Sequence, residues 1–290
     1  MWSGFNTRFN AIFALLFAAT TWGVLWYPLR LLDESGLDGL GSSLFMYAGT
    51  VFAAVYLLRG RWQELRRAPI ALLMLSVSAG WTNIAFILAV LDGTVVRVLL
   101  LFYLSPVWAI LLAWSILGER ITLRVWGVLV LAMAGALIML WHEESGLPYP
   151  QDNADWLALS SGFSFAVSNV IMRKTQSVSV NVKSVVGWFG VVLLAVMILG
   201  FRQSSIIDLN IIAVLAAFIL GATMIVFMTL SVAYGVSHLP VHQSAIILLF
   251  ELVVGTVSAM LLTDESILLR EWVGGALVIS AAYFSASESS

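Results

Sequence analysis

The sequence predicts an all-α integral membrane protein with ten transmembrane helices, arranged as two inverted five-helix repeats. Three observations predict this fold. The 290 residues are 61% hydrophobic and only 10% charged, whereas charged residues usually make up about a quarter of a globular chain. Apolar runs of the ~20 residues that a helix needs to cross a bilayer recur throughout the chain. Finally, residues 101–127 are echoed about 146 residues later by residues 247–274.

The apolar runs predict the individual membrane helices. Only helices and closed barrels satisfy their backbone hydrogen bonds in lipid, and runs this long without alternation exclude a barrel. In chain order, the predicted spans cover residues 9–29, 41–59, 69–91, 95–117, 122–141, 155–174, 181–199, 210–234, 240–262 and 268–286. The first span ends in Trp26-Tyr27-Pro28-Leu29-Arg30 and lacks a clean small-residue cleavage site, so we expect a membrane helix there and not a cleaved signal peptide.

The distribution of lysine and arginine predicts the orientation. Basic residues concentrate in the cytoplasmic loops of membrane proteins. With a cytoplasmic amino terminus, the inner side receives ten of the 14 basic residues, namely Arg8, Arg59, Arg61, Arg66, Arg67, Arg120, Arg124, Arg173, Lys174 and Lys183. The outer side receives only Arg30, Arg97, Arg202 and Arg270. We therefore expect both termini to lie in the cytoplasm.

The internal repeat divides the chain into two halves. The echo pairs Glu119 with Glu265, Arg124 with Arg270, and Trp126 with Trp272. Five helices per half is an odd number, so the second half must be inverted relative to the first. We predict a first repeat over 1–142, a periplasmic linker over 143–154 and a second, inverted repeat over 155–290. In membrane proteins built this way, the binding site lies where the halves meet.

Glu251 is the only carboxylate that we place deep in a predicted span. A charge there costs ~2.5–3.5 kcal/mol on insertion scales, so we expect this side chain to face a polar cavity or to be protonated. One interpretation is a site for a substrate amine or a proton. The other is a neutral glutamic acid that holds helices together by a hydrogen bond.

Aromatic side chains also lie unusually deep. Trp22, Trp81 and Trp108 fall near mid-membrane, where each indole N–H requires a partner, and Tyr103 lies close to Trp108 in the sequence. An aromatic-lined pocket would use these residues, and core packing is the alternative. Tryptophans near helix ends, such as Trp126, belong to the ordinary interfacial belt.

Polar residues gather inside several predicted helices. Asn83 follows Thr82 in the third span. In the sixth span Ser161, Ser164 and Ser168 recur at i, i+3 and i+7, which places them on one face of a helix. That face fits a cavity lining and a helix-packing seam equally well.

Two prolines are candidates for gating positions. Pro106 lies in the middle of the fourth span, where proline removes a backbone donor and bends a helix, and the repeat aligns it within one residue of Glu251. We expect a bend beside the cavity, with a simple packing kink as the alternative.

Pro240 separates His238 from His242, and these two histidines have no third metal ligand nearby. Pro240 and His242 are therefore candidates for gating or protonation at the cytoplasmic mouth, with a solvated loop as the alternative.

Several chemistries are excluded. The chain has no cysteine, which excludes disulfides, thiolate catalysis and cysteine metal sites. We find no G-x-S-x-G motif, no P-loop and no carboxylate pair suited to catalysis. Glu119, Asp264 and Glu265 fall in tight loops, where we expect them to cap helix starts. We therefore expect that the protein is not an enzyme and that it binds no cofactor and no metal.

The segment LSPVWAILLAWSILGERITLRVWG resembles the hallmark of the drug/metabolite transporter superfamily, in its ten-helix EamA-type branch. The likeness covers the whole chain. The second half departs from the hallmark, because Glu251 and Leu252 stand where a proline is common and Thr263-Asp264-Glu265 replaces Leu-Gly-Glu. The resemblance implies a secondary transporter of the bacterial inner (plasma) membrane, with a central cavity lined by the first, third, fourth, sixth, eighth and ninth helices. Bacterial aromatic amino-acid exporters belong to this branch.

These observations together predict an exporter of amino acids, aromatic or large neutral ones, or of similar small metabolites. It would work by alternating access around a mid-membrane cavity. The candidate substrate-binding residues are Trp22, Trp81, Asn83, Tyr103, Trp108, Ser164, Ser168 and Glu251, and the candidate gating residues are Pro106, Pro240 and His242. The expected partners are a small-molecule substrate, the lipid bilayer and protons as a candidate coupling ion, without nucleic acid. We expect a monomer or a weak homodimer.

Three alternatives stay open. An exporter of drugs, nucleotide sugars or sugar phosphates shares the same fold. Anionic substrates would need buried cations, and no lysine or arginine lies deep in a predicted span, Arg97 being the nearest at a helix end. A membrane-bound transferase would need a catalytic cluster at one face, which we cannot assemble. A non-transporting membrane scaffold would differ by showing no flux.

Overall fold

A computed structural model describes residues 2–93, 95–141, 150–202, 210–262 and 268–287. The predicted linker at 143–154 and the predicted cap residues Asp264 and Glu265 lie partly or wholly outside these ranges. All regular secondary structure in the described part is helical. Consecutive helical pieces in the described ranges group into ten spans, which confirms the predicted fold class.

The helices follow the predicted spans, several of which are built from consecutive pieces. The first half contains α1 (Trp2–Glu34), α2 (Gly39–Gly49), α3 (Val51–Leu58), η1 (Trp62–Arg66), α4 (Pro69–Asp92), α5 (Val95–Phe102), α6 (Ser105–Leu112), η2 (Ala113–Leu117) and α7 (Leu123–Leu140). The second half contains α8 (Asn153–Lys174), α9 (Val180–Arg202), α10 (Ile211–Leu220), η5 (Gly221–Ile225), α11 (Val226–His238), α12 (Val241–Leu248), α13 (Phe250–Leu262) and α14 (Leu269–Ser287).

Eight of these helices or helix runs are long and apolar enough to cross a membrane. The two predicted spans outside that group are α8 and α14. Their lower hydropathy has a visible cause in the sequence. Serine and asparagine interrupt the middle of α8, and α14 begins with the charged pair Arg270 and Glu271. Both pack against other helices of the bundle, α8 on α4 and α14 on α7.

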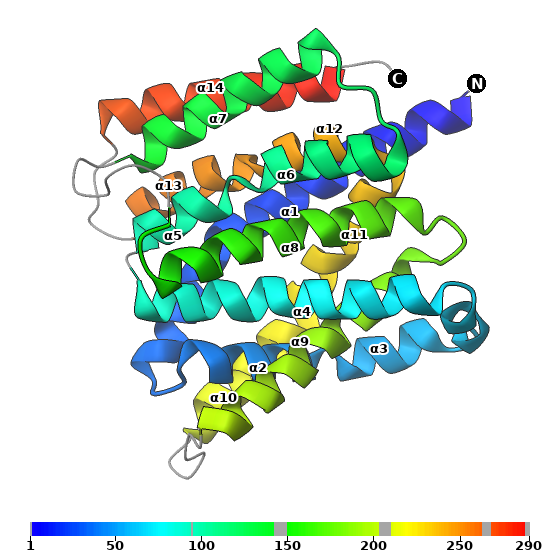
Figure 1. Cartoon of the computed structure of the whole chain (residues 1–290). Coiled ribbons are helices and arrows are strands. Elements are labelled where there is room, and N and C mark those ends of the chain that lie inside the picture. Colours follow the sequence, from blue (N-terminus) through cyan, green and yellow to red (C-terminus); the bar gives the residue numbers. More distant parts are fainter. Residues whose placement is uncertain (1, 94, 142–149, 203–209, 263–267, 288–290) are drawn as a thin grey trace.

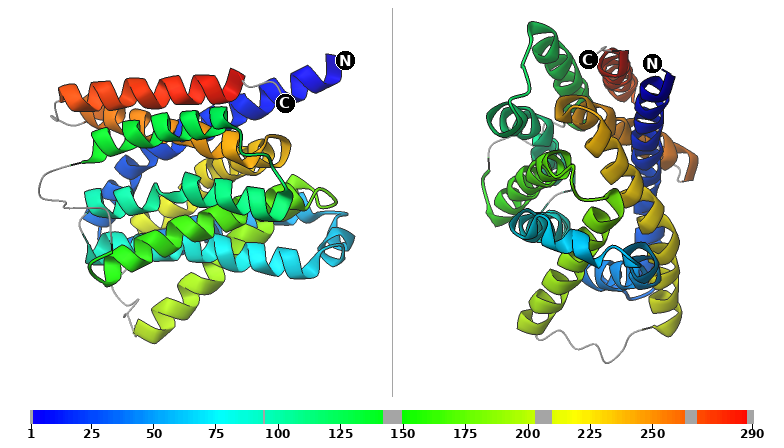
Figure 2. Two further views of the ribbon diagram at one scale, coloured as in Figure 1. Left: turned by 45° about the horizontal axis from the view of Figure 1, so that its top comes forward. Right: turned by 90° about the vertical axis from the view of Figure 1, so that its right-hand side faces the viewer.

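The helices run roughly along one axis, with both termini at the same end of the bundle (Figure 1). We call this end the termini end and the opposite end, where α7 stops and α8 begins, the linker end. In the views of Figure 2, α7 and α14 lie together at one edge of the bundle, and the end of α9 lies at the opposite edge.

Contacts between the two halves follow an exchange pattern. The third span (α4) packs on the sixth (α8) and seventh (α9), while the eighth (α10 and α11) packs on the first (α1) and second (α2). The fifth and tenth spans, α7 and α14, pack on each other. A twofold axis that relates two equivalent units produces such reciprocal contacts. The third helix of each half packs on the first and second helices of the other half. This pattern agrees with two structurally equivalent, inverted halves.

Glycines allow close backbone contact at two crossings that match in the two halves. A Cβ on Gly221 would collide with the backbone of Met46 on α2, and a Cβ on Gly49 would collide with Phe218 on α10. At the matching crossing, a Cβ on Gly80 would lie 2.6 Å from the carbonyl oxygen of Gly190. Gly190 follows Gly49 by 141 residues, and Gly221 follows Gly80 by the same 141 residues. Small residues at such crossings are typical of membrane helices.

The outer surface is apolar, as lipid contact requires. On α1, Phe9, Phe13 and Phe17 are 62%, 64% and 44% exposed, whereas Leu15 and Ala19 are completely buried. Residues four apart share one face of a helix, so one face of α1 meets lipid and the other meets the bundle.

Two spans are broken at equivalent points. In the fourth span α5 ends at Phe102 and α6 begins at Ser105, with Pro106 in the first turn of α6. The fourth span is thus interrupted just before Pro106. In the ninth span α12 ends at Leu248 and α13 begins at Phe250, although no proline is present there. The intervening Leu249 follows Tyr103 by 146 residues, which is the offset of the repeat.

Candidate functional site

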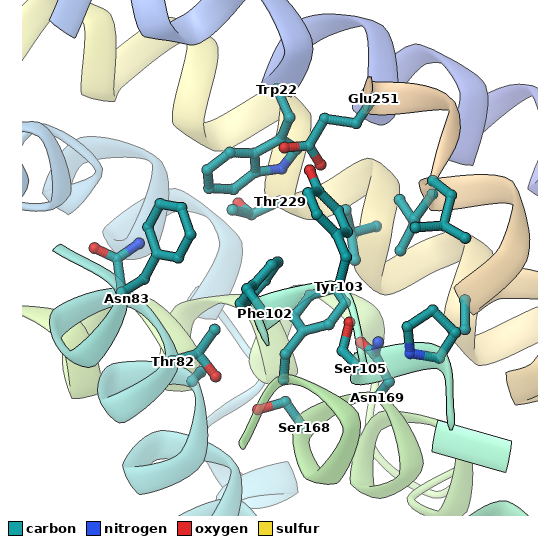
Figure 3. A pocket seen from close by; sticks show the side chains of 18 of the residues that line it. Trp22, Thr82, Asn83, Phe102, Tyr103, Ser105, Ser168, Asn169, Thr229 and Glu251 are labelled. Carbon is teal, nitrogen blue, oxygen red and sulfur yellow. The ribbon is translucent and has the colours of Figure 1, made fainter. Parts of the chain in front are cut away.

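A cavity of about 190 Å³ lies in the middle of the bundle, between the two halves. This volume is many times the ~10–15 Å³ that one water molecule needs. Side chains from seven spans line it, the first, third, fourth, sixth, eighth and ninth, together with Tyr47 from the second. Figure 3 shows the cavity with its polar and aromatic side chains.

Glu251 and Tyr103 form the polar centre of the cavity. A side-chain hydrogen bond joins the Tyr103 hydroxyl to the Glu251 carboxyl, and the two groups meet in Figure 3. Tyr103 lies in the break of the fourth span, and Glu251 lies in the first turn of α13, directly after the break of the ninth. The positive end of a helix dipole stabilises an acidic group in the first turn by ~0.3–1 kcal/mol. The two breaks therefore bring the pair together and offset part of the cost of burying it.

Aromatic rings form the wall around this pair. Phe102 is central, with its ring centroid 5.0 Å from Phe86, 5.3 Å from Tyr103 and 5.8 Å from Phe165. Trp22 lines the cavity from α1 and lies near Glu251 in Figure 3. The contacts of Phe102 with Phe86 and Tyr103 are edge-to-face, and the contact with Phe165 is tilted. Edge-to-face pairs contribute ~0.5–1.5 kcal/mol each and fix ring positions. The wall is therefore a preorganised apolar surface.

Phe86, Phe102 and Phe165 line the cavity but were not among the predicted site residues. Phenylalanine is common in this chain, with 16 copies, so composition does not single these three out. One signal was available for Phe165. It follows Trp22 by 143 residues, the same offset that relates Arg30 to Arg173, so the two cavity aromatics occupy equivalent positions of the repeat.

Asn83 lies in the cavity wall within a short polar chain. Its amide nitrogen donates to the Tyr47 hydroxyl at 3.1 Å, and its amide oxygen accepts from the Ser43 hydroxyl at 3.2 Å. On the other half, Thr229 accepts from the Trp188 indole N–H at 2.7 Å. In each half an aromatic residue of the second helix thus hydrogen-bonds a polar residue of the third.

The serine face of α8 is mainly a packing seam. Ser161 donates to the Thr82 carbonyl oxygen at 2.6 Å, and Ser168 donates to the Ser78 hydroxyl at 2.8 Å. Both bonds tie α8 to α4. Ser168 also lines the cavity, whereas Ser164 does not.

The predicted binding residues separate into two groups. Trp22, Asn83, Tyr103, Ser168 and Glu251 line the cavity, together with the predicted gating residue Pro106. Trp81 and Trp108 do not line it, nor does Ser164. The Trp81 indole donates to the Ser160 hydroxyl at 3.1 Å, and Trp108 packs its ring edge-on against Phe163 at 5.8 Å. For these two tryptophans the packing alternative describes what the structure shows.

The other two predicted gating residues lie at the termini end. Pro240 is the N-cap of α12, and His242 lies in the first turn of that helix. The Glu119 carboxylate accepts from the backbone N–H of Val241 at 3.1 and 3.2 Å and lies 3.3 Å from Nδ1 of His242. Glu119 therefore caps a helix, as predicted, but the helix belongs to the opposite half. Arg173 Nε lies 3.9 Å from the same carboxylate.

Lys183 extends this network across three helices. Its ammonium donates to the Met172 carbonyl oxygen at 2.6 Å and to the Ser237 hydroxyl at 3.2 Å, and the residue is only 1% exposed. Arg173 donates to the Ser237 carbonyl oxygen at 2.8 Å. Together with Glu119, these bonds join α8, α9, α11 and α12. At the linker end, Arg97 pairs with Asp155 of α8 at 2.7 Å.

No group of three His, Asp or Glu side chains among the described residues has the arrangement of a metal site. The chemistry that the cavity offers is recognition by charge, hydrogen bonds and aromatic surface.

Known proteins are similar to this chain in sequence or in fold. The chain is 27% identical over 175 residues to the proteins named RarD from Salmonella typhi, Salmonella typhimurium and Escherichia coli, which covers 58% of this chain and 56% of each relative. It thus spans about half the length of the curated relatives it matches. A solved structure described as "Crystal structure of protein" superposes with a TM-score of 0.78 at 17% identity, over 95% of both chains, which shows the same fold.

The family profile covers both halves. The EamA-like transporter family matches residues 9–141 and again residues 153–287. The match includes every cavity-lining side chain and both broken spans. The chain therefore belongs to the EamA-like transporter family of the drug/metabolite transporter superfamily, and it is a multi-pass membrane protein.

Proposed function

We propose that this protein exports amino acids, aromatic or large neutral ones, across the bacterial inner membrane by alternating access. One observation carries the proposal. The cavity contains a carboxyl group inside an aromatic wall, and no lysine or arginine is among its lining residues. Such a site favours a ligand that combines a positive amine with an apolar side chain.

The amine of the substrate binds Glu251. Burying a charge in a membrane is costly unless it is paired, so an incoming ammonium and the Glu251 carboxylate each reduce the cost of burying the other. Trp22 lies near the carboxyl in Figure 3, where its ring adds a cation–π contribution of ~0.5–2 kcal/mol. The substrate side chain then packs against the aromatic wall around Phe102.

A proton competes with the amine for the same carboxyl. Because one group binds either a proton or a substrate amine, occupation by one disfavours the other. A pH gradient then drives substrate movement by differential occupancy on the two sides of the membrane. In this proposal protons are the coupling ion, and Glu251 is the residue that exchanges them for substrate.

Alternating access is supported by the arrangement of the two halves. Inverted repeats allow one structure to open to either side by exchanging the conformations of its halves. The bonds at the termini end and the Arg97–Asp155 pair at the linker end are the contacts that such a motion would break and remake. The termini end is the cytoplasmic end if the distribution of basic residues sets the orientation.

The test is uptake by reconstituted liposomes. A labelled panel of phenylalanine, tryptophan, leucine and glutamate is offered with and without an imposed pH gradient. We expect saturable uptake of the first three, acceleration by the gradient, and loss of the gradient response in Glu251→Gln. Absence of amino-acid flux under both conditions would overturn the substrate class. An unchanged pH response in Glu251→Gln would overturn the role of the carboxyl.

Lipophilic amines are the second candidate substrate class. The same carboxyl and aromatic wall would bind an amine drug that has no carboxylate. Nucleotide sugars and sugar phosphates fit less well, because their charge would require the basic side chains that the lining residues do not include.

A further inference from the structure

Most hydrogen-bond donors of the cavity are already committed to partners within the protein. Thr82 donates to the Ser78 carbonyl oxygen at 2.8 Å, Thr229 to the Ile225 carbonyl oxygen at 2.6 Å, and Ser168 to the Ser78 hydroxyl at 2.8 Å. The remaining committed donors are the Asn83 amide, bonded to Tyr47, and the Tyr103 hydroxyl, bonded to Glu251. These side chains are structural supports for the site.

Asn169 is different. It lies on α8, lines the cavity and is only 1% exposed, yet its amide nitrogen Nδ2 has no hydrogen-bond partner among the described residues. Nearly all buried polar groups in proteins are hydrogen-bonded, so a buried amide donor without a partner requires an acceptor from elsewhere. The terminal torsion of asparagine is broad and roughly twofold. A half-turn of the amide therefore exchanges the positions of Nδ2 and Oδ1 without moving the backbone.

The position of Asn169 complements that of Glu251. In Figure 3, Glu251 and Asn169 are drawn at opposite sides of the cavity, with Tyr103 between them and Ser105 close to Asn169. Ser105 begins α6, and α6 packs directly on α8. The cavity thus has an acidic pole on one side and neutral donors on the other.

We propose that Asn169 recognises the carboxylate of the substrate, assisted by the Ser105 hydroxyl, while Glu251 binds the amine. This proposal rests on the proposed function and makes it more specific. Glu251 alone would favour a plain amine over an amino acid, because the carboxylate of an amino acid brings a second negative charge into the cavity. Asn169 reverses that preference by donating to the carboxylate. The site is then selective for molecules that carry both groups.

The test compares two probes that differ by the carboxylate. L-phenylalanine and 2-phenylethylamine share the ring and the amine, and only the first has a carboxylate. The full chain is reconstituted in liposomes, and the half-saturation constant for each labelled probe is measured. Loss of a hydrogen bond to a charged group predicts that Asn169→Ala raises the constant for phenylalanine roughly 10- to 100-fold. The constant for 2-phenylethylamine is expected to change less than about threefold, the low end for a neutral hydrogen bond, because this probe has no carboxylate for Asn169 to bind.

Asn83→Ala is the matched control, because Asn83 is the second asparagine of the cavity wall and its amide is already bonded to Tyr47 and Ser43. We expect this variant to affect both probes alike. Asn169→Asp adds a charge that repels the carboxylate, so it should exclude phenylalanine and retain 2-phenylethylamine. If Asn169→Ala does not fold, Asn169→Ser keeps a small donor and should show a weaker form of the same selectivity.

The outcomes separate the two proposals. An equal change for both probes in Asn169→Ala, or no change for phenylalanine, would overturn the role of Asn169 while leaving amino-acid transport intact. Transport of 2-phenylethylamine but not phenylalanine by the unmodified protein would instead overturn the proposed amino-acid function.

Discussion

At the scale of single residues, the site depends on how one carboxyl is accommodated in the membrane. Glu251 accepts from the Tyr103 hydroxyl and sits at the start of α13. A hydrogen bond to a charged group is worth ~1.5–3 kcal/mol, about twice the ~0.5–1.5 kcal/mol of a neutral one. The Tyr103 hydroxyl is therefore expected to contribute more to stability than the other cavity tyrosine, Tyr47, whose partner is the neutral Asn83 amide.

We predict that Tyr103→Phe lowers the free energy of unfolding by ~1.5–3 kcal/mol, because it leaves a buried carboxyl without its donor. Tyr47→Phe should cost only ~0.5–1.5 kcal/mol, because it removes a neutral bond. Both changes keep the ring and its packing. Thermal unfolding of the two variants in the same detergent measures the difference, and a smaller loss in Tyr103→Phe than in Tyr47→Phe would contradict the interpretation.

Glu64, outside the membrane spans, links two loops at the termini end. Its carboxylate accepts from the backbone N–H of Ser179 at 2.6 Å and from Arg61 at 3.3 Å. Burial raises the pKa of Glu64, but these hydrogen bonds outweigh burial and hold its pKa below its ordinary value. A carboxyl with a lowered pKa in the folded state adds stability above its unfolded pKa, and this stability is lost as the pH falls through the folded value.

The prediction for Glu64 concerns acid conditions. Wild type should be more stable than Glu64→Gln at pH 7. The difference should begin to shrink as the pH falls below about 4, the pKa of an ordinary glutamic acid, and should vanish as the pH passes the lowered folded pKa. Unfolding temperatures of both proteins across pH 3 to 7 provide the measurement. A stability difference that stays constant over this range would show that the bonds to Ser179 and Arg61 do not depend on the charge.

At the scale of helices, glycine decides how closely α4 and α9 approach. A Cβ on Gly190 would collide with the Ser76 carbonyl oxygen, which is backbone and cannot turn aside. The equivalent crossing of α2 with α10 and η5 has the same constraint at Gly221. Because apolar side chains gain no hydrophobic energy by leaving lipid for another helix, close packing is the main attraction between these helices.

We predict that Gly190→Ala destabilises the protein by ~1–3 kcal/mol through overpacking. The control is Gly127→Ala in α7, where an added Cβ meets nothing within 4 Å. There the substitution should be neutral or stabilising by up to ~1 kcal/mol, because alanine is the better helix former. Thermal unfolding in detergent compares the two. Equal behaviour of both variants would contradict the role given to the crossing.

At the scale of the whole molecule, the termini end is closed by bonds that join both halves. Glu119 comes from the loop after η2 and caps α12, and Arg173 of α8 lies beside it. Opening this end of the cavity would break these bonds. Met172 is a useful reporter, because its side chain lines the cavity and its carbonyl oxygen accepts from Lys183.

We predict that Glu119→Gln shifts the protein toward a state that is open at the termini end. The chain has no cysteine, so Met172→Cys provides a single thiol. A membrane-impermeant maleimide added at the termini side should label this thiol several-fold faster when Glu119→Gln is also present. Ser287→Cys, exposed at the end of α14, controls for access and should label equally fast with either residue at 119. An unchanged rate at position 172 would exclude a gating role for Glu119.

The fold could be predicted from the sequence because hydrophobicity and charge report position along the membrane normal. Twenty-residue apolar runs predicted the helices, the spacing of Glu119 and Glu265 predicted the repeat, and the depth of Glu251 predicted a carboxyl in a cavity, which it lines. Transfer free energy depends strongly on depth, so each of these signals is visible in one dimension.

Only the tertiary structure decides which side of each helix faces the cavity and which faces lipid or another helix. Trp22, Trp81 and Trp108 fall at similar predicted depth, yet only Trp22 lines the cavity, while Phe102 and Phe165 complete its wall. Lipid and protein interior are similarly apolar, so an aromatic residue gives no sign of which one it faces. That choice depends on contacts between residues distant in the chain, such as the two matched helix breaks that place Tyr103 beside Glu251.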